Sequence, residues 1–217
     1  MIKITFVALL VLISFQGTQA VIGVDIYSPF NNFQCLKDNG VQFVIARGYQ
    51  SYGAVDSANV ATIKNAKSAG LITDIYHFPC VGKVSAADQV SATVNTFGSL
   101  YGTVWIDVET NPSSGCGWTS NINTNCQFLK DIVAAYKSHG KLVGIYSSQY
   151  QWTSIFGAAG NCSYFTNLPI WYAHYDNSPS FSDWYNGLSF GGWSDPAIKQ
   201  YDGDETACGA GVDFNFY

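Results

Sequence analysis

Charged residues are scarce in this 217-residue chain: they make up 12% of it, with 15 acidic against 10 basic residues. A chain with this balance offers no positive field for phosphate groups, which argues against nucleic-acid binding. Disordered chains combine high charge with low hydrophobicity, so a hydrophobic content of 47% argues against disorder as well. Glutamate is especially rare, because Glu109 and Glu205 are the only two in the sequence.

Long hydrophobic runs are missing after residue 20. Residues 4–13 form an apolar run that is shorter than the ~20 residues needed to span a bilayer. Because Lys3 precedes this run and small residues ending at Ala20 follow it, residues 1–20 are predicted to be a signal peptide. We therefore expect residues 21–217 to form one exported domain with no membrane contact, either extracellular or in a lysosomal or phagosomal lumen.

The cysteines fit export, because disulfides persist in oxidising compartments. The six candidates are Cys35, Cys80, Cys116, Cys126, Cys162 and Cys208. Spacing alone does not define their connectivity, but a Gly-, Ser- and Asn-rich loop makes Cys116–Cys126 the preferred local pair. A zinc site is the alternative, although no CxxC or HxxxH spacing supports it. The sequon at Asn161 contains a cysteine, which leaves its glycosylation open.

Short β-branched apolar runs alternate with longer segments of helical periodicity. Strands buried on both faces are expected at residues 21–26, 41–47, 71–78, 103–109 and 142–147. Helices are expected at residues 56–69, 86–100 and 124–139, with shorter ones at 29–38 and 149–156.

The pattern changes after residue 160. Three more strands are expected at 169–174, 197–201 and 211–216, with loops at 175–196 and 202–210. Eight strands and about five helices in βα order predict an α/β fold, a (β/α)8-type barrel with incomplete helices, since a full barrel takes about 250 residues. An open doubly wound sheet is the alternative, although no GxGxxG follows the first strand.

Carboxylates gather where the expected strands end. Asp25 belongs to the first strand, Asp107 and Glu109 to the fourth, and Asp213 to the last. Active sites of α/β barrels form at one end of the strands, and the first and last strands are neighbours in a closed barrel, so Asp25 and Asp213 should converge. Asp107 and Glu109 should face the same side, where burial and mutual repulsion would keep one of them protonated, as a general acid requires.

Carboxylate clusters also bind Mg²⁺ or Ca²⁺. His77 and His174 each end an expected strand but form no HxH pair, which argues against a metal hydrolase. We expect no metal, and we interpret His77 either as a structural residue or as one that supports the site without touching the substrate.

Aromatic side chains lie at or just beyond the same strand ends. Their flat apolar faces and polar edges suit sugar rings, so a saccharide cleft is expected around the carboxylates. The aromatic set is Tyr27, Tyr49, Tyr76, Tyr146, Trp171, Tyr172, Trp184, Trp193 and Tyr201. The predicted substrate-binding residues are Tyr76, Tyr146, Trp171, Tyr172, Gln200 and Tyr201.

These positions belong to an ordered set of motifs that runs through residues 21–217. The motifs are Gly23-Val24-Asp25, Phe43-Val44-Ile45-Ala46-Arg47, Tyr76-His77-Phe78, Trp105-Ile106-Asp107-Val108-Glu109, Gly144-Ile145-Tyr146-Ser147, Ile170-Trp171-Tyr172-Ala173-His174-Tyr175, Gln200-Tyr201-Asp202 and Gly211-Val212-Asp213-Phe214-Asn215. In their order and spacing they resemble the Chalaropsis-type lysozymes, glycoside hydrolase family 25.

The resemblance implies an enzyme that needs no cofactor and cleaves the β-1,4 bond between N-acetylmuramic acid and N-acetylglucosamine in peptidoglycan glycan strands. We expect this enzyme to be a monomer. The resemblance also implies that Glu109 is the acid/base and that Asp107 orients the substrate acetamide, whose oxygen attacks the anomeric carbon. Asp25 and Asp213 would shape the floor of the site, and Asp107 or Asp213 as a direct nucleophile is the alternative. The disulfides and the negative charge depart from the family pattern, and the charge favours an acidic working compartment for defence or digestion.

Two other functions compete with this interpretation. Chitinase barrels also end a strand in DxE, but they carry further aspartates upstream, where this chain has Gly102, Thr103 and Val104. A catalytically inactive saccharide-binding protein would typically lack an acid at position 107 or 109, and both acids are present here.

Overall fold

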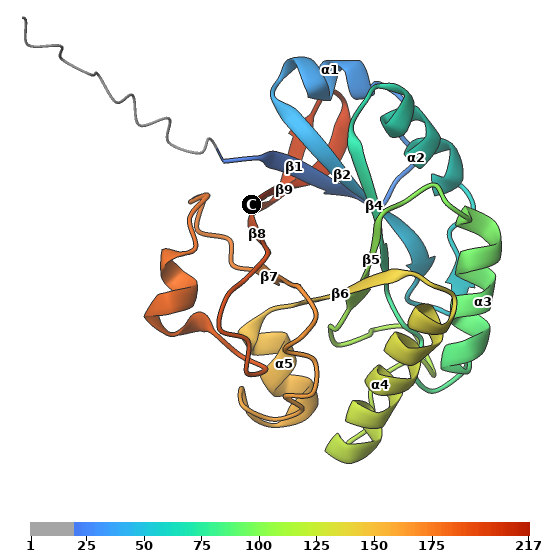
Figure 1. Ribbon diagram of the computed structural model, residues 1–217, viewed down its shortest axis with the longest axis vertical. Coiled ribbons are helices and arrows are strands. Elements are labelled where there is room, and N and C mark those ends of the chain that lie inside the picture. The colour runs from blue at the N-terminus through green and yellow to red at the C-terminus, as the bar shows by residue number, and fades with distance from the viewer. Residues whose placement is uncertain (1–19) are drawn as a thin grey trace, which may run out of the picture.

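The computed structural model describes residues 20–217, so the predicted signal peptide lies almost entirely outside the described residues. Within residues 20–217, no helix combines the length and the apolar character needed to cross a bilayer. Figure 1 shows strands arranged around a common axis, with helices on the outside.

Nine strands form one sheet, and eight of them close into a barrel. The strands are β1 (Ile22–Ile26), β2 (Val41–Gln50), β3 (Ala54–Val55), β4 (Ile72–His77), β5 (Thr103–Asp107), β6 (Leu142–Ser147), β7 (Ile170–Ala173), β8 (Ile198–Ala207) and β9 (Ala210–Phe216). Around the barrel they lie in the order β1-β9-β8-β7-β6-β5-β4-β2, and pairing of β1 with β2 closes the ring. The predicted α/β barrel is therefore confirmed. The short strand β3 lies outside the ring and pairs with the C-terminal end of β2.

Helices cover the barrel incompletely, as predicted. They are α1 (Phe33–Asp38), α2 (Asn59–Ser68), α3 (Ala86–Phe97), α4 (Ile122–Ser138) and α5 (Gln149–Phe156). In Figure 1, α1 to α4 follow one another around the outside of β1 to β6. Beyond β7 the described chain has no α-helix, and a short π-helical turn, η1 (Trp184–Leu188), lies in the connection to β8.

The last strand departs from the all-parallel sheet of the predicted (β/α)8-type barrel, because β9 runs antiparallel to both β8 and β1. Residues 202–210, predicted to be a loop, instead continue β8 and turn back into β9. Cys208 and Gly209 form the two-residue turn with φ values of 54° and 84°, as a tight hairpin requires. Polar residues in this exposed hairpin hid the strand pattern.

Large aromatic rings fill the barrel interior against glycines on neighbouring strands. A Cβ atom on Gly23 would lie 2.3 Å from the Phe43 ring, and one on Gly144 would lie 2.4 Å from the Trp105 ring. The indole nitrogen of Trp105 donates a hydrogen bond to Asp74 Oδ2 (2.9 Å), which fixes the ring in the interior. Because the interior is packed, a binding cleft is expected at the end of the barrel where the parallel strands terminate.

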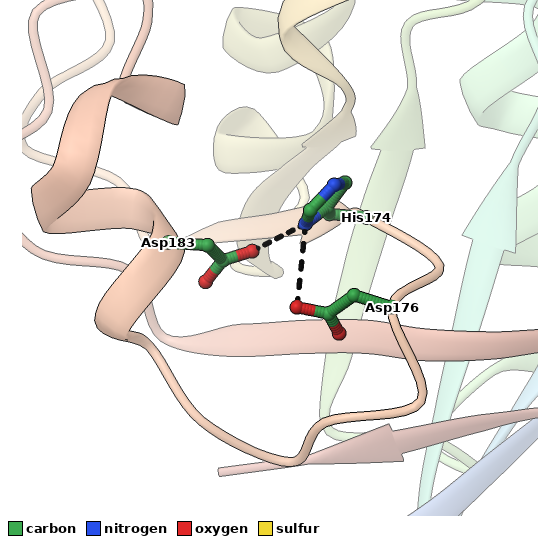
Figure 2. Close-up of side chains that lie close together, drawn as sticks. All are labelled: His174, Asp176 and Asp183. Carbon is green, nitrogen blue, oxygen red and sulfur yellow. Dashed lines mark hydrogen bonds and ion pairs between the residues drawn. The ribbon is translucent and has the colours of Figure 1, made fainter.

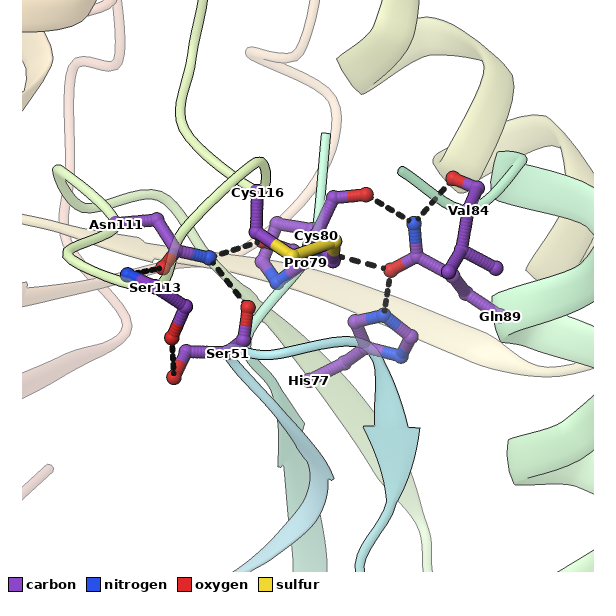
Figure 3. Close-up of a disulfide and its surroundings, with 9 residues drawn as sticks. All are labelled: Ser51, His77, Pro79, Cys80, Val84, Gln89, Asn111, Ser113 and Cys116. Carbon is purple, nitrogen blue, oxygen red and sulfur yellow. Dashed lines mark hydrogen bonds between the residues drawn. A yellow bond between two sulfur atoms is a disulfide. The ribbon is translucent and has the colours of Figure 1, made fainter. Parts of the chain in front are cut away.

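The expected Cys116–Cys126 disulfide is wrong. Cys116 pairs with Cys80, Cys126 with Cys162, and Cys35 with Cys208. The neighbouring strands β4 and β5 bring the segments that follow them side by side, so Cys80 meets Cys116 (Figure 3). Cys116 and Cys126 are close in sequence but do not pair, because barrel closure, not loop length, decides which cysteines lie side by side.

His77 is a structural residue, as expected, and it is fully buried at the end of β4. Its Nδ1 lies 2.7 Å from the Tyr136 hydroxyl and its Nε2 lies 3.1 Å from Gln89 Oε1. The Gln89 amide also donates to the carbonyls of Cys80 and Val84 and accepts from the Cys80 amide (Figure 3). Burial lowers the pKa of His77 to about 3, so the ring is neutral and Gln89 links it to the disulfide-bonded segment.

We expect Gln89→Ala to lower the free energy of unfolding by about 2–4 kcal/mol, because several buried polar groups would lose their partner. Gln127→Ala is the matched control, since this exposed glutamine on α4 makes one side-chain hydrogen bond, to Asp131. Urea unfolding followed by circular dichroism measures both. Equal, small effects of the two substitutions would contradict a structural role for the Gln89 network.

Candidate active site

A cleft of about 280 Å³ opens at the end of the barrel where the parallel strands terminate. Its wall comes from residues at or beyond the ends of six strands, together with residues of the β8–β9 hairpin. The lining residues are Asp25, Tyr27, Arg47, Ser51, Tyr76, Phe78, Asp107, Glu109, Tyr146, Trp171, Tyr175, Gln200 and Asp213. All four predicted catalytic carboxylates therefore share one cleft.

Asp107 and Glu109 come from the end of β5. The strand ends at Asp107, two residues earlier than expected, and Val108 still donates its amide to the Tyr146 carbonyl (2.8 Å). Besides burial, the Glu109 carboxyl group raises the pKa of Asp107, whereas Asp107 acts to lower that of Glu109. Asp107 is 4% exposed, and its Oδ1 has no hydrogen-bond partner among the described residues. A buried acceptor without a donor is costly, and it fits a ligand that supplies an N–H or O–H group.

Asp25 and Asp213 face each other across β1 and β9, where they form a directly opposed pair. They converge as predicted, although the last strand runs in the opposite direction to the one assumed. The amide of Gln200 lies between them, and its Nε2 donates to Asp25 Oδ1 (2.8 Å) and Asp213 Oδ2 (3.1 Å). Asn215 on β9 donates a further hydrogen bond to Asp25 Oδ1 (2.8 Å).

Two tyrosines hold the other side of the Gln200 amide. Its Oε1 accepts hydrogen bonds from the hydroxyls of Tyr146 (2.6 Å) and Tyr175 (2.9 Å). Because both tyrosines donate to the oxygen, the amide nitrogen must face the carboxylates. Gln200 is 2% exposed, so water does not compete for these contacts.

The environment of the cleft favours protonated carboxyl groups. Burial, reinforced by the charge of Asp213, raises the pKa of Asp25 to about 8. Burial also raises the pKa values of Glu109 and Asp213, and burial together with the charge of Glu109 raises that of Asp107 well above its usual range. Arg47 is the one cation among the lining residues, and its Nε is already paired with Asp56 Oδ2 at 2.8 Å. These shifts favour protonated carboxyl groups in the cleft, as general-acid chemistry requires.

The predicted substrate-binding residues divide into two groups. Tyr76, Tyr146, Trp171 and Gln200 line the cleft. Tyr172 faces the outside of β7, where it packs against Trp184 with ring centroids 4.9 Å apart, and Tyr201 packs against Phe214 and Phe216. Side chains alternate between the two faces of a strand, so the neighbours Trp171 and Tyr172 lie on opposite sides of the barrel wall.

Other members of the aromatic set are structural. Tyr49 stacks on His77 with centroids 4.3 Å apart, and Trp184 and Trp193 are buried in the outer core around Phe190. Tyr175 was not among the predicted substrate-binding residues, although it lines the cleft just beyond the strand predicted at 169–174. Its position after an expected strand end was the signal that could have identified it.

A cluster of His174, Asp176 and Asp183 lies beside the cleft, in the connection between β7 and β8 (Figure 2). Within residues 20–217 it is the one group of three such side chains with metal-like spacing. Lys199 Nζ lies 2.8 Å from Asp176 Oδ2 and 3.0 Å from Asp183 Oδ2. The ammonium group of the chain itself therefore takes the cation position, and the donor set does not fit a resident metal.

Comparisons with known proteins agree with this geometry. A family model described as Lys-1, lysozyme-like protein 1, matches residues 16–201. Probable GH family 25 lysozyme 2 from Dictyostelium discoideum is 40% identical over 99% of this chain and 96% of its own length. Lysozyme-like protein 5 from Caenorhabditis elegans is 38% identical over 89% of this chain and 90% of its own length.

Solved structures show the same architecture. A muramidase from Trichobolus zukalii superposes with a TM-score of 0.76 at 26% identity, covering 91% of this chain and 94% of its own. A family GH25 lysozyme from Aspergillus fumigatus has a TM-score of 0.76 at 24% identity, covering 92% and 94%. With the family model, the relatives and the cleft in agreement, the chain belongs to the glycoside hydrolase family 25 lysozymes.

Proposed function

We propose that this glycoside hydrolase cleaves the β-1,4 bond between N-acetylmuramic acid and N-acetylglucosamine in peptidoglycan, with retention of configuration through the substrate acetamide. The observation that carries the proposal is the Asp107–Glu109 pair, which lies in one cleft and includes a buried Asp107 oxygen without a donor among the described residues. The structural neighbour from Trichobolus zukalii is a muramidase by name, which agrees with this proposal.

Glu109 acts as the acid in the first step. Its raised pKa keeps a proton available, and the glycosidic oxygen receives that proton as the bond to the anomeric carbon breaks. The acetamide oxygen of the substrate attacks the anomeric carbon at the same time and forms a cyclic oxazolinium ion. Glu109, now ionised, then deprotonates the water that opens this ring.

Asp107 orients the acetamide. Its unpaired Oδ1 accepts the acetamide N–H, which aims the acetamide oxygen at the anomeric carbon. Asp25 and Asp213, held by Gln200, form the floor beneath the reacting sugar. Direct attack by Asp107 or Asp213 is the alternative mechanism, and a covalent glycosyl-enzyme would identify it.

The cleft also supplies apolar surfaces for sugar rings. Tyr27 and Tyr175 line it with rings that are 57% and 56% exposed, and Trp171 contributes a buried edge. Half-exposed aromatic rings at the mouth of a polar cleft are suited to the faces of pyranose rings. We propose that the enzyme works on bacterial walls as a secreted monomer, in defence or digestion.

We expect Glu109→Gln to lower the release of reducing sugar from peptidoglycan by at least about a thousandfold, because the amide cannot donate and recover the proton. Glu205→Gln is the matched control, since Glu205 is exposed on the β8–β9 hairpin. Circular dichroism establishes that both variants fold. Turnover near that of the wild type in Glu109→Gln would remove Glu109 from this role.

Product analysis separates the muramidase from the alternatives. Mass spectrometry of wall digests should show N-acetylmuramic acid at the new reducing end, because the bond cut lies on its anomeric carbon. Parallel digestion of chitin tests the hypothesis that the enzyme is a chitinase. Binding to wall fragments without cleavage over long incubation would support the inactive saccharide-binding protein instead.

We expect the protein to be more stable at pH 5 than at pH 8. Between the unperturbed pKa of 3.8 and the folded-state pKa of about 8, folded Asp25 keeps a proton that the unfolded chain releases. The folded state therefore binds more protons in this window, and stability falls as the pH rises through it. Asp107, Glu109 and Asp213 act in the same direction.

Thermal unfolding at both pH values measures the effect. A difference of one pKa unit corresponds to about 1.4 kcal/mol, which shifts Tm by about 3–6 °C in a domain of this size. Asp25→Asn should flatten the pH dependence, whereas Asp131→Asn, an exposed carboxyl group on α4, should leave it unchanged. A Tm that rises between pH 5 and pH 8 would contradict the buried protonated cleft.

A further inference from the structure

We infer that Lys199 is a positioning residue for the active site: it fixes Tyr175, which orients Gln200 and forms part of the cleft wall. Lys199 and Gln200 are consecutive in β8, and their side chains face opposite sides of the barrel wall. Gln200 faces the cleft, and Lys199 faces the segment of the β7–β8 connection that contains Tyr175. As far as activity is concerned, the inference rests on the proposed function.

The Lys199 side chain is 0% exposed, and its ammonium group has a partner for each of its three N–H groups. Its three N–H groups meet Asp176 Oδ2 (2.8 Å), Asp183 Oδ2 (3.0 Å) and the Ser180 carbonyl (3.1 Å). A buried ammonium group is tolerated when it is paired in this way. We call Lys199, Asp176, Asp183 and His174 the lysine clamp.

The lysine clamp encloses Asp183 from several directions. His174 Nδ1 lies 2.7 Å from Asp183 Oδ2 (Figure 2), and the Tyr172 hydroxyl donates to Asp183 Oδ1 at 2.7 Å. Burial acts in the other direction, but hydrogen bonds from Tyr172, Lys199 and His174 hold the pKa of Asp183 below its usual value. The carboxylate is therefore ionised and available to pair with Lys199.

Tyr175 lies between two members of the lysine clamp in sequence, His174 and Asp176. His174 donates its amide to the Gln200 carbonyl (3.0 Å), and Asn177 donates its amide to the Tyr201 carbonyl (2.9 Å). The backbone on both sides of Tyr175 is thus fastened to β8. This anchoring brings the Tyr175 hydroxyl to 2.9 Å from Gln200 Oε1.

Gly203 provides the space for the Tyr175 ring. A Cβ atom at position 203 would lie 2.7 Å from Cζ of Tyr175, closer than the ring could accept without moving. The ring is 56% exposed, so burial does not hold it in place. Its position depends on the bare backbone at Gly203 and on the clamp.

Tyr175 has two separable roles in this arrangement. Its hydroxyl, with that of Tyr146, turns the Gln200 amide so that the nitrogen faces Asp25 and Asp213. Its ring forms an aromatic wall on the β7 side of the cleft, where it can contact a sugar ring. A loosened clamp would weaken substrate binding and leave the chemistry of Asp107 and Glu109 largely intact.

The test is a double-mutant cycle between Lys199→Met and Tyr175→Ala, measured as kcat and KM on soluble peptidoglycan fragments. Methionine keeps the length of the side chain and removes its charge. We expect each single variant to lower kcat/KM about tenfold, mainly through KM, and the double variant to lose no more than about twofold beyond Tyr175→Ala. Lys64→Met, an exposed lysine on α2, is the matched control.

Independent effects would overturn the inference. If Lys199→Met lowers kcat/KM by the same factor with or without the Tyr175 side chain, Lys199 acts through general stability. If Lys199→Met leaves KM unchanged, it does not position the cleft wall. Tyr175→Phe should keep KM near that of the wild type, because the ring remains, and should lower kcat no more than Tyr175→Ala does, because both variants lose the hydroxyl.

Two further variants keep the test usable if Lys199→Met does not fold. Asp176→Asn weakens the clamp and leaves the Asp183 pair, and Gly203→Ala displaces the Tyr175 ring without touching the clamp. Both should raise KM in the wild type and have no effect on KM in Tyr175→Ala. An effect that persists in Tyr175→Ala would count against the inference.

Hydrogen exchange gives a measurement that does not depend on turnover. Lys199→Met should speed amide exchange at His174 and Asn177 at least about tenfold, because the backbone bonds to β8 open more often. Unchanged exchange there would overturn the positioning role. If the wild type fails to produce new reducing ends, the proposed function fails, and the exchange result still decides whether the clamp holds the Tyr175 segment.

Discussion

The orientation of one side-chain amide, that of Gln200, determines how the catalytic cleft is assembled. Its oxygen accepts two tyrosine hydroxyls and its nitrogen donates to two carboxylates, so these contacts define one orientation. The reversed amide would place its oxygen against Asp25 and Asp213 and its nitrogen against two hydroxyl groups. Hydrogen bonds of the Gln200 amide therefore connect β8 to residues of β1, β6, β9 and the β7–β8 connection.

The low positive charge of the chain has a local counterpart in the cleft. Four carboxyl groups share a space whose one lining cation, Arg47, is paired with Asp56. Protons, rather than cations, therefore neutralise the carboxyl groups, and the raised pKa values of Asp25, Asp107, Glu109 and Asp213 express this. The raised pKa values support the proposal, first made from the net charge, that the enzyme works in acidic surroundings.

The sequence predicted the elements more accurately than their relations in space. Apolar periodicity is local, so all eight barrel strands and the five α-helices were located to within a few residues of their ends, apart from the long β8. The direction of β9 and the partner of Cys116 depend on which segments meet after barrel closure, and local patterns do not contain that information. The same limit explains Tyr172 and Tyr201: strand alternation places neighbours on opposite faces, but two adjacent aromatics do not reveal which one faces inward.

The order of the disulfides along the chain has a further consequence. Cys35–Cys208 spans 173 residues and encloses both Cys80–Cys116 and Cys126–Cys162, which follow one another without overlap. A protease that cuts one peptide bond anywhere between Cys35 and Cys208 therefore leaves the two fragments covalently joined. The barrel strands can then remain paired after the cleavage. This property suits an enzyme that would meet proteases wherever bacteria are being broken down.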